Sequence, residues 1–175
     1  GDGFMSYDRA NVIKLFSSYE HCLVKEGKED IWGDGNCTIN ILNNDGTLRE
    51  VFFLMDSGDY MTEESKKEYG VTDEDEVYDG VKTSQVEWYK EKHDALTAEY
   101  GKFKSVTVLH IPPYQTEREY SENDFLYGEK REGVCESGFD AGLIDATIVG
   151  VNTFGKGIMQ GTYGYTDNST VTVTV

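Results

Sequence analysis

The sequence predicts an α/β fold, and three observations carry that prediction. Residues 36–42 and 48–55 are apolar and β-prone, and the turn residues between them favour a hairpin. Residues 84–100 place apolar side chains every three or four positions, as an amphipathic helix does. A short apolar run at residues 105–110 follows that helix and reads as a buried strand. Strands and helices therefore alternate along the chain.

Length and composition favour one folded domain. The chain has 175 residues, of which 38% are hydrophobic and 13% aromatic, values typical of an ordered protein. The formal net charge of −17 would repel nucleic acid and anionic membrane, so neither is an expected partner. No apolar run is long enough to span a bilayer. Nothing in the sequence indicates a cellular compartment.

The first half of the chain predicts a helix, a hairpin and a loop, in that order. Residues 6–20 have apolar residues at helical spacing, with Ser6 as the expected N-cap. The hairpin follows at residues 36–55. Residues 56–82 are rich in Gly, Asp and Glu without a sustained period, and predict an exposed loop.

The long helix after this loop is expected to begin at a capping box formed by Ser84 and Glu87. Its apolar face contains Val86, Tyr89, His93, Leu96 and Tyr100. We interpret His93 as a core or boundary histidine with no chemical role, because histidines on an apolar face are more often structural than catalytic.

The chain then returns to strands. His110 ends the predicted strand 105–110, at the carboxyl edge where open α/β sheets bind ligands. Residues 138–145 predict a short helix, and residues 146–151 a further strand. Residues 157–175 end in alternating Thr and Val, which predicts an antiparallel hairpin.

Four segments in order resemble the calcineurin-like metallophosphoesterases related to purple acid phosphatases. They are residues 53–60 (FLMDSGDY), 81–90 (VKTSQVEWYK), 110–112 (HIP) and 128–138 (GEKREGVCESG). The resemblance covers the middle portion of that family, about residues 2–145. It implies an incomplete metallophosphoesterase-like sandwich, to which the sequence adds the C-terminal β-hairpin.

The family resemblance implies a hydrolase of phosphate esters that uses divalent metal ions, Mn, Fe or Zn. In that family an isolated histidine at a strand end is a metal ligand, and His110 matches it. Two-metal hydrolysis needs several converging carboxylates and imidazoles, and the family's other ligand motifs have no counterpart here. We therefore expect the chain to be inactive by itself. Asp56 and Asp59 belong to a matching segment and are interpreted as structural turn residues.

Residues 147–175 instead resemble a segment of S41 carboxyl-terminal processing peptidases. In that family the lysine of a Phe-Gly-Lys-Gly turn is the general base for a serine nucleophile, and Lys156 matches this lysine. Ser137 is the nearest upstream serine, but its surroundings do not match the nucleophile segment. The sequence thus reads as two incomplete hydrolase segments with a fusion junction near residue 146.

Three functional hypotheses follow. The first is a phosphoesterase-like fragment that binds a phosphate-ester small molecule, with His110 as a metal ligand. The second is a non-catalytic scaffold or interaction module, in which His110 is a hydrogen-bonded remnant. The third is an S41-type peptidase relative using Lys156. A missing part of the parent sheet would leave strand edges unpaired, which predicts a homodimer or exchanged strands.

Overall fold

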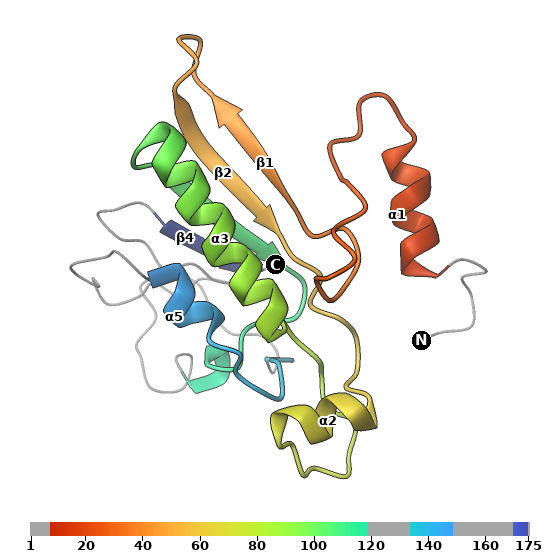
Figure 1. The fold of residues 1–175 in the computed structure, drawn as a ribbon. Helices are drawn as coiled ribbons and strands as arrows, with labels where there is room; N and C mark the ends of the chain where they lie inside the picture. Colours follow the sequence, from red (N-terminus) through yellow and green to blue (C-terminus); the bar gives the residue numbers. More distant parts are fainter. Residues whose placement is uncertain (1–7, 119–133, 149–169, 175) are drawn as a thin grey trace.

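The fold is a mixed α/β arrangement in which one long helix, α3, covers one face of a small open sheet and runs along its strands (Figure 1). The computed structural model describes residues 8–118, 134–148 and 170–174. The elements in chain order are α1 (Arg9–Ser17), β1 (Cys37–Leu42), β2 (Leu48–Leu54), α2 (Glu63–Tyr69), α3 (Thr83–Tyr100), β3 (Lys104–Leu109), α5 (Leu143–Ile148) and β4 (Thr170–Thr174).

The sheet has the order β1-β2-β3-β4, and its first pair is the predicted hairpin. β1 and β2 are antiparallel, joined by a turn in which Asn43 N–H donates to Thr47 O at 2.8 Å. β2 and β3 are parallel, and the connection between them contains α2 and α3. β4 pairs with β3, also in parallel. The predicted α/β class is confirmed.

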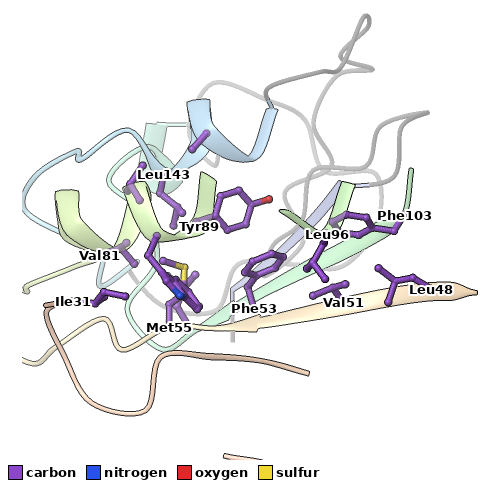
Figure 2. Close-up of a cluster of buried hydrophobic side chains, with 14 residues drawn as sticks. Ile31, Leu48, Val51, Phe53, Met55, Val81, Tyr89, Leu96, Phe103 and Leu143 are labelled. Carbon is purple, nitrogen blue, oxygen red and sulfur yellow. The ribbon is translucent and has the colours of Figure 1, made fainter. Parts of the chain in front are cut away.

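The hydrophobic core lies between α3 and one face of the sheet (Figure 2). Val51 and Phe53 of β2 are fully buried, and Phe53 packs against the rings of Trp88 and Tyr89 at centroid distances of 6.0 and 4.5 Å. Burial raises the pKa of Tyr89 to about 12, because the phenolate would lose its hydration. Of the predicted apolar face of α3, Val86, Tyr89 and Leu96 are buried, whereas His93 and Tyr100 are only partly buried.

The start of α3 differs from the predicted capping box. The helix begins one residue earlier than Ser84, and Lys82 is its N-cap. Gln85 Oε1 accepts the Lys82 N–H at 2.7 Å, whereas the Ser84 hydroxyl accepts the backbone N–H of Trp32. The box is displaced by two positions, and the buried Gln85 amide also donates to the Asp56 carbonyl oxygen and to Asn36 Oδ1.

The prediction of an exposed loop over residues 56–82 is wrong. This segment contains α2, whose N-cap Thr62 accepts the Ser65 N–H and whose C-cap Gly70 has φ 70°. Several of its side chains, including those of Met61 and Asp79, are buried. The helix has only seven residues and no apolar period, so its capping residues are the only signal in the sequence that indicates a helix here.

α1 is shorter than predicted and begins at a different cap. Asp8 is the N-cap, and its side chain accepts the Asn11 N–H at 2.8 Å. The expected cap, Ser6, lies outside the described residues. No residue of α1 is fully buried, and Phe16 is 53% exposed. Its apolar stripe therefore adds nothing to the core between α3 and the sheet.

Residues 146–148 are helical, which corrects the prediction of a strand over 146–151. α5 places Leu143 and Ala146, one turn apart, in the core cluster with α3. Burial of this face overrides the β-prone character of the segment. Most of the predicted hairpin over 157–175 lies outside the described residues, and its described part is β4.

Candidate functional site

The carboxyl ends of β2 and β3 bring together two segments that lie far apart in the sequence. Leu54 of β2 is in register with Val108 of β3, and both strands run in the same direction. Asp56 and His110 each follow two residues later, so both stand at the same edge of the sheet. Open α/β sheets bind ligands at this edge, which makes it the candidate site.

Ser57 connects these two segments directly. Its hydroxyl oxygen accepts the backbone N–H of His110 at 3.2 Å and that of Ile111 at 2.9 Å. Ser57 is 2% exposed, so no bulk water competes for these two donors. The imidazole of His110, by contrast, belongs to an exposed residue at the strand end.

The carboxylate of Asp56 is largely occupied by hydrogen bonds within the protein. It accepts the Asp34 N–H at 2.9 Å, the Gly58 N–H at 2.9 Å and a guanidinium N–H of Arg9 at 3.2 Å. Gly33 permits this approach, since its φ is 88° and a Cβ there would lie 2.8 Å from the Asp56 Cβ. These contacts fit the structural role that the sequence predicts for Asp56.

The backbone of Asp56 is held on both sides by buried amides. Asn36 Oδ1 accepts the Asp56 N–H at 3.0 Å, and Gln85 Nε2 donates to the Asp56 carbonyl oxygen at 2.7 Å. Gln85 Nε2 also donates to Asn36 Oδ1 at 2.7 Å, which closes the network. Gln85 is fully buried, so the amino end of α3 fixes the end of β2.

A groove of about 510 Å³, here called the edge groove, opens beside these segments. Its apolar walls come from α1, the segment after it and the two strand ends, and include Ile13, Val24, Leu54 and Val108. Its polar lining consists of Arg9, Asp34, Asp56 and His110. One cationic, two acidic and one histidine residue thus line the same groove.

These donor types suit Mn, Fe or Zn, which bind imidazole and carboxylate ligands. Asp56 accepts three N–H groups and so retains limited capacity for a metal, since a carboxylate has about four lone-pair sites. Among residues 8–118, 134–148 and 170–174, no three His, Cys, Asp or Glu side chains are grouped closely enough to hold a metal ion. The described residues therefore fit a single ligand at His110 but not an assembled two-metal site.

The other described candidates, Ser137 and His93, are not among the residues that line the edge groove. Lys156 lies outside the described residues. Ser137 is buried, and its hydroxyl donates to the Phe139 carbonyl oxygen at 2.9 Å. His93 contacts the rings of Tyr89 and Phe103, and burial lowers its pKa.

Several residues of this edge have no counterpart among the sequence predictions. Arg9, Asp34 and Asn36 come from the first helix and an irregular loop, where only long-range contacts reveal a role. Gln85 carries one local signal, since it stands at the third position of α3 where a capping-box side chain is expected.

Comparisons with protein-family models, curated proteins and solved structures found no match to this chain. In the described part of the chain, no helix combines the length and apolar character needed to cross a membrane.

Proposed function

We propose that this chain is a metallophosphoesterase-related unit whose edge groove receives a phosphate-ester small molecule, with His110 as a metal ligand. The observation that carries the proposal is the shared carboxyl edge of β2 and β3. Their parallel register places His110 beside Asp56 and over a groove that also contains Arg9. This is where the sequence resemblance puts a ligand-bearing histidine, and where α/β sheets gather ligands.

Each polar group in the edge groove has a role under this proposal. His110 would hold a divalent cation through its imidazole, and that cation would neutralise charge on the phosphoryl oxygens. Arg9 would add hydrogen bonds to the same oxygens, because a guanidinium matches phosphate geometry. Hydrolysis would further require metal ligands beyond those described here, from another part of the molecule or a neighbouring chain. We include in this proposal that the mixed α/β fold is an incomplete metallophosphoesterase-like sandwich.

A non-catalytic scaffold is the second candidate, and the hydrogen bonding of Asp56 favours it. The Asp56 carboxylate accepts hydrogen bonds from α1, from the loop at Asp34 and from the turn at Gly58, as expected of a residue with a structural role. Under this alternative the groove persists as part of the scaffold, and His110 holds no metal. The S41-type alternative rests on Lys156, outside the described residues.

Metal stoichiometry separates the first two candidates. Mass spectrometry of the chain purified without chelator should find near-stoichiometric Mn, Fe or Zn in the wild type and loss of that metal in His110→Ala. His93→Gln is the matched control, because His93 lies on α3 near Phe103, at the opposite edge of the sheet. It should retain the metal. A metal-free wild type would overturn the phosphoesterase proposal and favour the scaffold.

A further inference from the structure

We infer that three buried hydroxyls between α3 and β3 form a binding site for one internal water molecule. They belong to Tyr89 of α3 and to Ser105 and Thr107 of β3. None of the three residues lines the edge groove, so the inference does not depend on the proposed function. The water would join α3 to β3 by hydrogen bonds inside the core.

The register of the sheet directs Ser105 and Thr107 toward the core. Ser105 is in register with Val51 and Thr107 with Phe53, and paired residues point to the same face of a sheet. Val51 and Phe53 belong to the hydrophobic core under α3. Ser105 is 1% exposed and Thr107 is fully buried, so neither hydroxyl meets bulk water.

Tyr89 brings the third hydroxyl to the same place from α3. Its ring lies 4.5 Å from that of Phe53, the residue beside Thr107 on the neighbouring strand. Burial raises the pKa of Tyr89 to about 12, although the Ser105 hydroxyl lowers it, which places the Ser105 and Tyr89 oxygens near each other. Tyr89 is 1% exposed, so its hydroxyl is also cut off from solvent.

Protein groups do not satisfy these three hydroxyls. In the described part of the chain, the side-chain oxygens of Tyr89, Ser105 and Thr107 are buried and have no hydrogen-bond partner. Buried polar groups without a partner destabilise a fold, and internal waters typically make about three hydrogen bonds to such groups. The three oxygens therefore have the chemistry of a water site.

One water can serve all three hydroxyls at once. Alternate residues of a strand stand about 6.6 Å apart, so Ser105 and Thr107 flank a space that a water reaches from both sides. The Tyr89 hydroxyl would donate to the water, which would donate its own two protons to the Ser105 and Thr107 oxygens. A direct bond from Tyr89 to Ser105 would instead leave Thr107 unpaired.

A high-resolution crystal structure tests the site directly. Density for a water within about 3.2 Å of at least two of the three oxygens is the expected result. Three hydroxyls bonded to protein groups, with no water among them, would overturn the inference.

The sign of the stability change in Thr107→Val gives an independent test. Valine keeps the shape of threonine without its hydroxyl, so losing bonds to the water should raise the unfolding equilibrium constant by about three- to tenfold. An unpaired hydroxyl predicts the opposite, since its removal would stabilise the protein. Thr38→Val is the matched control, because Thr38 stands in the same row through Phe53 but is only partly buried. Urea unfolding of Thr38→Val should match the wild type, and a Thr107→Val variant at least as stable as the wild type would sink the inference.

A double-mutant cycle shows whether the two elements share the water. Tyr89→Phe and Thr107→Val should together raise the unfolding equilibrium constant by less than the product of their separate fold-changes, because both remove bonds to one water. Effects that multiply would mean that the two hydroxyls act independently, which contradicts a shared site.

Discussion

Lys82 is an unusual residue because its ammonium group is buried among aromatic rings. Its Nζ lies 4.5 to 5.1 Å from the ring centroids of Phe139, Tyr69 and Trp32. The same atom pairs with the carboxylate of Asp79, and the two side chains are only 7% and 5% exposed. The rings and the carboxylate together replace the hydration that burial removes.

Lys82→Met should destabilise the protein by about 3–5 kcal/mol, the usual cost of leaving a buried charge without its partner. The additional change Asp79→Asn should recover part of this loss, because it removes the uncompensated charge and still accepts the Gly80 N–H. Urea unfolding of the two variants measures both effects. A double variant no more stable than Lys82→Met would show that the ring contacts, and not the charge pair, dominate.

α1 packs weakly against the rest of the described fold. The described contacts that join it to the sheet edge are the Arg9–Asp56 ion pair and the packing of Ile13 beside Gly35, and no residue of α1 is fully buried. Leu15 and Phe16 are both 53% exposed. Because tertiary packing supplies most helix stability in proteins, this helix depends strongly on its cap.

Asp8→Ala should remove the N-cap hydrogen bond to Asn11 and cost about 1 kcal/mol of helix stability. Since α1 packs so little, the loss should appear as local opening and not as global unfolding. Faster amide exchange across residues 12–17, with an unchanged urea midpoint, is the expected result. A lower urea midpoint that corresponds to a loss of about 1 kcal/mol in the free energy of unfolding would mean that α1 unfolds together with the core.

At the scale of the whole molecule, β1 is an edge strand of the described sheet, and it carries no charged residue. Ile41 and Leu42 at its end are 38% and 50% exposed. Natural edge strands are commonly protected by charged residues or proline, and β1 has neither. The homodimer or strand exchange predicted from sequence has a candidate strand here, opposed by the net charge of −17.

Light scattering at several protein concentrations should therefore show a dimer whose fraction rises between low and high salt. Salt screens the repulsion between two acidic copies and leaves backbone pairing of β1 intact. Ile41→Lys should shift the protein to a monomer, because a charge at the edge disfavours pairing. A wild type that stays monomeric at every concentration and salt level would contradict the prediction.

The sequence by itself determined the local elements of this fold. The hairpin at β1 and β2, the apolar face of α3 and the strand β3 just before His110 all follow from short-range patterns, because period and turn chemistry act within a few residues. Local patterns did not predict the correct element where a helix is very short or where its residues are also compatible with a strand. α2 has caps without an apolar period, and the β-prone residues of α5 became helical once Leu143 and Ala146 found the core.

Only the tertiary structure decided how the site is put together. Sequence placed His110 at a strand end, but the parallel pairing of β2 and β3 brings Asp56 and Ser57 beside it. The partners Arg9, Asn36 and Gln85 come from three further segments. Contacts between residues about 20 to 54 positions apart depend on how whole elements pack, and no local pattern encodes that arrangement.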